Sequence, residues 1–359
     1  MEPQLTIVIP TKNRAPFLAR ALGYYRDMGC PYPILLGDSS DPEHLEPIMK
    51  LIDAIGDRLE IHHLIDPGAT QTSAAGWQTD TFLRDLITHV ETPYVALYAD
   101  DDFAVVNNLT HGIEFLKTHQ DYSFVCGDAA WFALQSGTAN GKLAGLARYL
   151  QHEYAADTPK ARLDHLLRNY TVLEYGISRT AEKKFRWGKV FEAEVDNLTG
   201  ELINCCLVVM QGKVKQLDQL FLVRQAHGGQ TSLAPGDVFD WSSGVLFPDR
   251  YQKLRDIISD ELTTRMGLSP ESANDTFKRA FWYYLSKSMW ASHPENKLAA
   301  GGSNTWKLAG RVPGAQNLAR KIRDLSGRGI SLKSALNPAS PHHSDFMPVY
   351  RAITTANGN

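Results

Sequence analysis

Three consecutive carboxylates, Asp100, Asp101 and Asp102, directly follow the apolar run at residues 94–99. Such a run is typical of a parallel strand that is buried on both faces. In open α/β sheets, ligands bind at the carboxyl ends of these strands. Neighbouring acids repel one another unless a cation compensates them, and hard oxygen ligands suit Mg²⁺ or Mn²⁺. The triplet therefore predicts a divalent metal site, and a solvated turn cap after the strand is the alternative.

Alternating strand-like and helix-like segments lead up to the triplet. Strands are predicted at residues 5–10, 32–37, 59–65 and 94–97, and helices at 15–28, 43–55 and 72–90. This interval implies right-handed crossovers and a largely parallel sheet, which makes the fold class α/β. The glycine signatures of dinucleotide-binding and P-loop proteins, GxGxxG and GxxxxGK[ST], are absent from this part of the sequence.

The segments after the triplet are less regular. Helices are predicted at 109–119, 202–210, 251–266 and 273–290, a strand at 123–127, and a strand or short helix at 214–223. Residues 136–189 have a weak pattern, for which we expect mobile loops over a site. The aromatic-rich stretch 281–290 is expected to be core or a subunit contact in a homodimer, with a ligand platform as the alternative.

Composition narrows the function classes. The chain has 359 residues, of which 43% are hydrophobic and 21% charged, as in an ordinary globular protein. Its net charge of −3 argues against a nucleic-acid partner. Residues 297–333 nevertheless carry eight Lys or Arg against a single acid, which indicates either a solvated surface or contact with anionic lipid headgroups.

Location and redox state also have sequence indicators. A leader-like start and an apolar run of about 18 residues are both missing, so we expect a cytoplasmic protein. Peripheral contact at the inner face of the membrane through the basic segment is the alternative to a fully solvated segment. The four cysteines lack CxxC spacing and are expected to be buried thiols.

Four segments, in this order, resemble the family 2 glycosyltransferases, which have the GT-A fold and use nucleotide-diphosphate sugars. Residues 10–14 are similar to the family's "IPTYNR" segment, and residues 36–41 to its "VVDDGSTD", with Gly37 where the first acid is usual. The triplet looks like its DxD region. Gly200-Glu201 and the later Arg224-x-x-His227 resemble its "ED…G(K)…R…H" segment. The resemblance covers residues 4–235 and is greatest to bacterial members that act on surface polysaccharides or other glycoconjugates.

The resemblance implies a GT-A domain at residues 1–240 and a helical C-terminal extension with a basic tail at 241–359. It also implies site residues. The nucleotide sugar would be bound by Pro10, Thr11, Asn13, Arg14, Asp38, Asp100, Asp101 and Arg224. The metal would be held by Asp102 first, then by Asp100 and His227. The general base would be Glu201, with Asp196 and Glu194 as substitutes because Gly200 replaces the family's first acid.

The expected reaction is metal-dependent transfer of a sugar from a nucleotide-diphosphate donor, UDP-linked by the family's preference, onto a glycan or lipid-linked glycan, with inversion. A sugar-nucleotide nucleotidylyltransferase is an alternative, disfavoured because the first loop lacks the glycine-rich, basic signature that cradles a triphosphate. A non-catalytic nucleotide- or glycan-binding protein of the same fold is the other alternative. The sequence leaves the sugar, the acceptor and the choice of base open.

Overall fold

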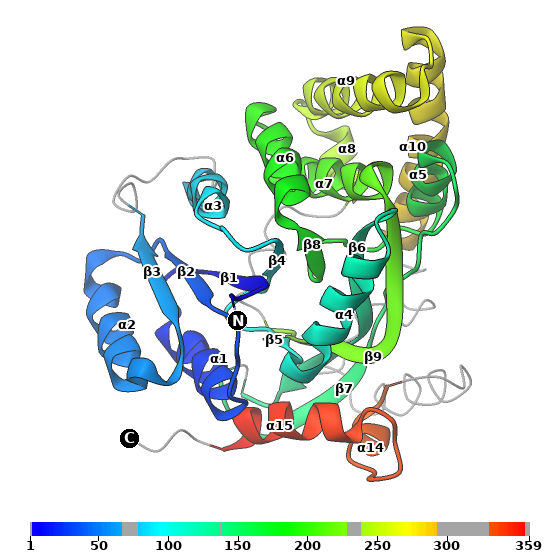
Figure 1. Cartoon of the computed structure of the whole chain (residues 1–359). Helices are drawn as coiled ribbons and strands as arrows, with labels where there is room; N and C mark the ends of the chain where they lie inside the picture. The colour runs from blue at the N-terminus through cyan, green and yellow to red at the C-terminus, as the bar shows by residue number, and fades with distance from the viewer. Residues whose placement is uncertain (1, 67–77, 137, 228–237, 293–329, 356–359) are drawn as a thin grey trace.

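The computed structural model of the chain describes residues 2–66, 78–136, 138–227, 238–292 and 330–355 (Figure 1). A mixed β-sheet runs through the molecule, and helices cover both of its faces. The strand order is β3-β2-β1-β4-β8-β6-β9-β5, and β7 pairs with β6.

The first half of the sheet is parallel, as predicted. Its strands are β1 (Leu5–Thr11), β2 (Ile34–Asp38), β3 (Ile61–Ile65) and β4 (Tyr94–Leu97). They alternate with α1 (Ala15–Asp27), α2 (Pro42–Ile55), the short η1 (Gly56–Arg58) and α3 (Gln78–Thr88). Ile7 packs in the core under α1 and α2, whereas Val8 packs with Leu86 of α3 on the other face. Burial on both faces explains why these strands are continuously apolar.

The second half differs from the prediction. Its elements are β5 (Phe103–Ala104), α4 (Val106–Thr118), β6 (Tyr122–Leu134), β7 (Leu143–Tyr149), α5 (Pro159–Arg168), β8 (Ile177–Arg179), α6 (Thr180–Glu192), α7 (Asn197–Gln211) and β9 (Lys213–Gln225). β8 is antiparallel to β4 and β6, and β7 is antiparallel to β6. A largely parallel sheet is therefore correct for the first half only. Residues 136–189 are also wrongly predicted as loops, because they contain β7, α5, β8 and α6.

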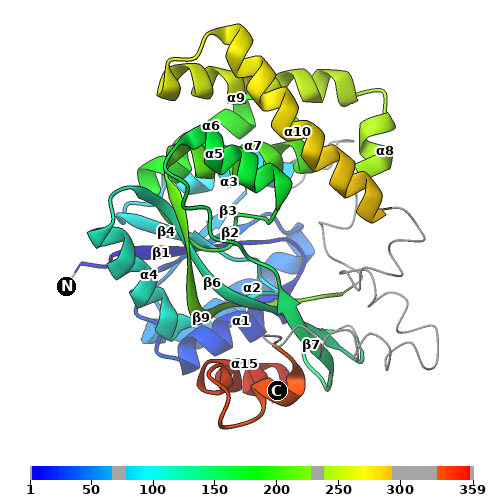
Figure 2. The same ribbon diagram turned by 90° about the vertical axis from the view of Figure 1, so that its right-hand side faces the viewer.

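The remaining helices lie on two opposite sides of the sheet (Figure 2). α8 (Val238–Ser243), α9 (Phe247–Met266) and α10 (Pro270–Ser292) pack in one core with α5 and α7. α14 (Leu332–Ala335) and α15 (His343–Thr354) lie across the sheet from them, where α15 contacts α1 and β9. The domain boundary near residue 240 stays a prediction. The basic segment lies mostly outside the described residues.

Helix α15 holds a loop that comes from the middle of the chain. The Asn140 side chain donates to the carbonyl of Ala352 at 2.8 Å, and the Gly141 amide donates to the carbonyl of Ile353 at 2.9 Å. A third bond fixes α15 to α4, because the side-chain amide of Asn108 donates to Asp345 at 2.9 Å. The loop at residues 138–141 is thereby fixed against α15.

Two further predictions concern cysteines and aromatic residues. All four cysteines are buried and free, as expected. In α10, Phe277 and Phe281 are buried whereas Trp282 is 68% and Trp290 72% exposed, so only one face of this helix belongs to the core. Among the described helices, none has the length and apolar character needed to cross a membrane.

Two glycines test how tightly the second half of the sheet packs. A Cβ on Gly176 would lie 2.5 Å from the carbonyl oxygen of Val125, whereas a Cβ on Gly188 in α6 would meet nothing within 4 Å. Gly176→Ala should therefore lower the free energy of unfolding by about 2 kcal/mol. Gly188→Ala should raise it by about 0.5–1 kcal/mol, because alanine favours a helix interior. Urea unfolding measures both, and equal effects would contradict this packing.

Candidate active site

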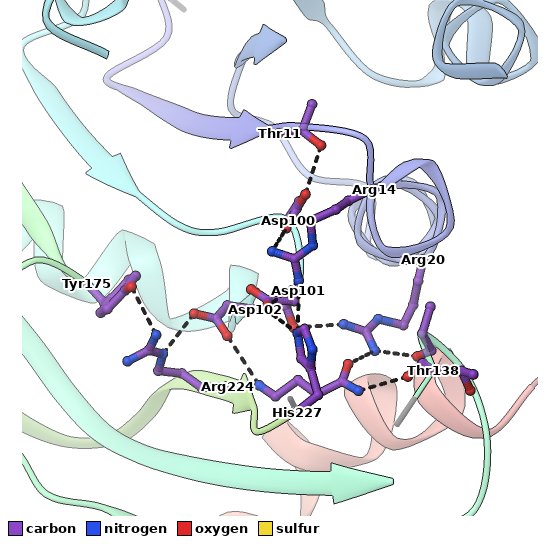
Figure 3. A network of polar contacts seen from close by, with 12 residues as sticks. Thr11, Arg14, Arg20, Asp100, Asp101, Asp102, Thr138, Tyr175, Arg224 and His227 are labelled. Atoms are coloured by element: carbon purple, nitrogen blue, oxygen red, sulfur yellow. Dashed lines mark hydrogen bonds and ion pairs between the residues drawn. The ribbon is translucent and has the colours of Figure 1, made fainter. Parts of the chain in front are cut away.

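Strand ends bring the first candidate residues together. Thr11 ends β1 and pairs in register with Asp38, which ends β2, and the acidic triplet follows β4. Because these strands are parallel, their carboxyl ends meet at one edge of the sheet. The Thr11 hydroxyl donates to Asp100 at 2.8 Å across that edge (Figure 3).

Each carboxylate of the triplet has a basic partner from elsewhere in the chain (Figure 3). Arg14 contacts Asp100 at 3.0 Å and Asp101 at 2.7 Å. Asp101 also lies 2.8 Å from Nε2 of His227. Asp102 accepts from Nε of Arg224 at 2.9 Å and from the Gln225 amide at 3.2 Å. The three acids are at most 3% exposed, so their charges are compensated inside the protein.

Burial and pairing shift these groups in different directions. Burial raises the pKa of Asp100 to about 7, although Arg14 opposes the shift. Burial also acts on Asp101, but the hydrogen bond with His227 and the charge of Arg14 outweigh it and lower its pKa to about 2. For Arg224, burial alone would lower the pKa, and the Asp102 carboxylate instead raises it well above its ordinary value. Arg224 therefore keeps its charge in the interior.

Arg20 is a site residue that the sequence analysis missed. It is 1% exposed and donates to the carbonyl oxygen of Asp101 at 2.7 Å. It also donates to the Gln225 side chain and to the carbonyl of Ala139, in the loop that α15 holds. Burial lowers its pKa to about 10. The sequence did contain a signal for Arg20, because residues three apart lie on the same face of a helix and Arg20 follows Phe17 by three residues. Its guanidinium carbon lies 5.5 Å from the centroid of the Phe17 ring.

The loops after β1 and β2 are bound to each other. The Asn13 side chain exchanges hydrogen bonds with Asp41, at 2.5 and 2.8 Å, and Asn13 has a positive φ of 56°. Asp38 is fully buried and lies 3.0 Å from His63. Burial would raise the pKa of Asp38, but the bonds from His63 and Ser40 outweigh it and lower the value. Pro10 is part of β1, one residue before its end, where the sequence had predicted the end itself.

Three aromatic rings surround the guanidinium of Arg224, and we call them the aromatic wall: Trp131, Tyr149 and Tyr175. Their ring centroids lie 4.5, 5.2 and 4.1 Å from its central carbon. Arg224 also donates to the Tyr175 hydroxyl at 3.0 Å (Figure 3). Arg224 is 7% exposed, whereas each ring is half-buried. No sequence motif predicted this cluster, because its members come from β6, β7, β9 and the segment before β8.

The three candidate bases have different surroundings. Glu201 in α7 accepts from the Tyr170 hydroxyl at 2.9 Å, and burial raises its pKa to about 7. Arg224 acts on Glu201 in the opposite direction, so the two groups lie within electrostatic range. Asp196 caps α7 and contacts Arg250 of α9 at 2.5 Å. Glu194 is exposed. Glu201 is thus bonded to Tyr170, whereas Asp196 joins two helices.

The donor groups of the site fit a divalent cation only in part. Across the described residues, no three His, Cys, Asp or Glu side chains gather in a set that could hold a metal ion. Asp101 and His227 do converge, and carboxylate with imidazole suits Mn²⁺. The sequence favoured Asp102, but both of its oxygens are bonded to β9. Arg14, whose side chain is 22% exposed, is the cation that now bridges Asp100 and Asp101.

The buried Arg224–Asp102 pair can be tested by stability. Asp102→Asn leaves the Arg224 charge without a counter-charge, so the free energy of unfolding at pH 8.5 should fall by about 3 kcal/mol. Asp27→Asn, at a side chain that is 68% exposed, is the control and should change it by less than about 0.5 kcal/mol. Equal losses in urea unfolding would rule out a buried pair.

Comparison with known proteins identifies the fold through solved structures alone. No protein-family model matches the sequence, and no curated protein matches it either. Among solved structures, S. aureus TarS 1-349 in complex with UDP-GlcNAc is similar, with a TM-score of 0.51 and 14% identity over 82% of this chain and 78% of that one. A structure of S. aureus TarS has a TM-score of 0.51 and 12% identity over 83% of this chain and 47% of that one.

At such identities the similarity concerns the backbone. This chain and these structures therefore share a fold, in which a parallel half of the sheet precedes a mixed second half. The chain has the GT-A-type glycosyltransferase fold.

Proposed function

We propose that this protein is a glycosyltransferase that moves a sugar from a nucleotide-diphosphate donor, UDP-linked, onto a glycan or glycoconjugate acceptor. One observation carries the proposal: in a GT-A-type fold, the triplet at the carboxyl edge of the sheet is surrounded by Arg14, His227 and Arg224. Arg14, whose side chain is 22% exposed, suits a substrate whose negative charge grows as a diphosphate departs. The similar structure with UDP-GlcNAc supports a donor of this class.

The donor would lie along the carboxyl edge of β2, β1 and β4. Asp38 lies at the end of this edge proposed for the nucleobase, and His63 holds its buried carboxylate in place at 3.0 Å. Arg14 is the cation suited to meet the diphosphate, because its side chain is the most exposed of the three arginines at the triplet. Its guanidinium can contact two phosphate oxygens at once.

A divalent cation would be held by Asp101 and His227, the two donor side chains that converge at the triplet. Bound there, it would neutralise charge on the leaving diphosphate. Asp102 would instead keep Arg224 in place, since both of its oxygens are bonded.

Glu201 is the proposed general base, and inversion needs one base at the acceptor hydroxyl. With a pKa of about 7, it can accept a proton near neutral pH. Asp196 is excluded from this role in the proposal because its carboxylate caps α7 and pairs with Arg250.

A second candidate function is nucleotide binding without catalysis. It is favoured by the bonds that occupy Asp100 and Asp102, since a site whose acids are all paired could hold a ligand without reacting. Binding without turnover would select it. A cytoplasmic location, peripheral membrane contact and a homodimer stay predictions from the sequence.

Donor and metal binding can be measured by thermal shift with UDP, GDP, CMP, dTDP and ADP, each with Mn²⁺ and with EDTA. One nucleotide should raise the melting temperature only with Mn²⁺, because a ligand of the native state stabilises it by mass action. Asp101→Asn should remove the metal-dependent part, whereas Asp27→Asn should retain it. If no nucleotide raises the melting temperature of the wild type, the proposed function fails.

The pH profile tests Glu201. Below pH 7 the Glu201 carboxyl is protonated and cannot take the proton from the hydroxyl of the acceptor sugar. The value of kcat should therefore rise tenfold per pH unit up to about pH 7 and stay constant above it. Glu201→Gln should lower kcat by about 10²–10⁴-fold while the nucleotide thermal shift stays. The exposed Glu194→Gln is the matched control. A profile that is flat from pH 5.5 to 8 in the wild type would remove Glu201 as the base.

A further inference from the structure

The aromatic wall lies at the opposite end of the site from Asp38 and His63, the residues proposed to lie at the nucleobase. Asp38 and His63 belong to β2 and β3, at one side of the sheet order, and the triplet follows β4 in the middle. Trp131 and Arg224 are paired in register on β6 and β9, on the other side. If the nucleobase of the donor lies at β2 and its diphosphate at the triplet, the sugar is the part of the donor that lies nearest the wall.

Charge on the wall is already balanced. Among the described residues, the guanidinium of Arg224 contacts all three rings. Its positive charge is paired with Asp102 at 2.9 Å. A phosphate would gain little from a cation that a carboxylate has neutralised. An uncharged ring with one apolar face suits such a surface better, since aromatic faces contribute mainly apolar contact area.

The wall also has the polar groups that orient a hydroxylated ligand. Tyr149 and Tyr175 combine an apolar ring with a hydroxyl, and both rings are half-buried. Burial raises the pKa of Tyr149 and the charge of Glu201 adds to that shift, which is an electrostatic coupling between the proposed general base and this ring. The hydroxyls of these two tyrosines could orient the hydroxyls of a sugar on the wall.

We propose that Trp131, Tyr149 and Tyr175 form the acceptor subsite, and that the acceptor presents an uncharged pyranose ring to them instead of a phosphate. This inference rests on the proposed function. The alternative is that the rings only shield Arg224 from water. Ligand contact at Trp131 distinguishes the two, because a purely shielding ring would not touch a sugar.

Saturation-transfer NMR on the full chain tests the subsite, in the presence of Mg²⁺ and the nucleotide found by thermal shift. The probes are the methyl pyranosides of glucose, galactose, mannose and N-acetylglucosamine, with glycerol 3-phosphate as the charged probe. Irradiation of aromatic protons should saturate the ring protons of at least one pyranoside and leave glycerol 3-phosphate unaffected. Trp131→Leu and Tyr149→Leu should each reduce that signal at least fivefold, and Trp131→Phe should restore most of it.

Trp282→Leu is the control, because this tryptophan is 68% exposed on α10 and has no part in the proposed site. The inference is overturned if no pyranoside is saturated in the wild type, if Trp131→Leu keeps the full signal, or if glycerol 3-phosphate is saturated instead. The nucleotide thermal shift of each variant shows that it is folded. A shift without a pyranoside signal refutes the acceptor subsite alone, whereas no shift in the wild type refutes the proposed function itself.

Discussion

The site depends on neutralising three adjacent buried carboxylates. Each ionised side chain costs several kcal/mol to remove from water, so the triplet can be buried only with cations and donors around it. Those partners come from separate parts of the chain: Arg14 and Arg20 from the segment after β1, and Arg224 from β9. The pairing of acids with arginines therefore joins the first strand unit to the last strand of the sheet.

The three arginines differ in freedom. Arg20 and Arg224 are at most 7% exposed, and each is fixed by several partners, so they act as part of the scaffold. Arg14 is the more exposed and contacts two of the acids. Replacing Arg14 by another cation at Asp100 and Asp101 would require movement of Arg14 and of the His227 ring that contacts Asp101. It would leave the Asp102–Arg224 pair in place.

The first half of the fold could be predicted from sequence because its strands are buried on both faces and its crossovers are short. The second half could not, since α6 buries Lys183 and Arg186, which interrupt the apolar pattern that marks a helix face. The sequence analysis named Thr11, Arg14, Asp38, the triplet, Arg224 and His227 because they lie at or just beyond strand ends in a familiar order, and their roles stay predictions. Arg20 and the aromatic wall were missed because tertiary contacts alone bring them to the site. Gly37, which departs from the family pattern, also has a tertiary reason: a Cβ there would lie 2.4 Å from Leu86.

The bonds from α15 to the loop at residues 138–141 have a consequence for synthesis. That loop accepts hydrogen bonds from Arg20 and Gln225, and it is itself held by Ala352 and Ile353. Chains leave the ribosome from the N-terminus, and early units fold first. The strands that carry Thr11 and Asp38 can form long before the last helix emerges. A nascent chain that has not yet reached residue 353 would thus contain the acidic triplet while the loop that accepts from Arg20 still lacks its bonds to α15.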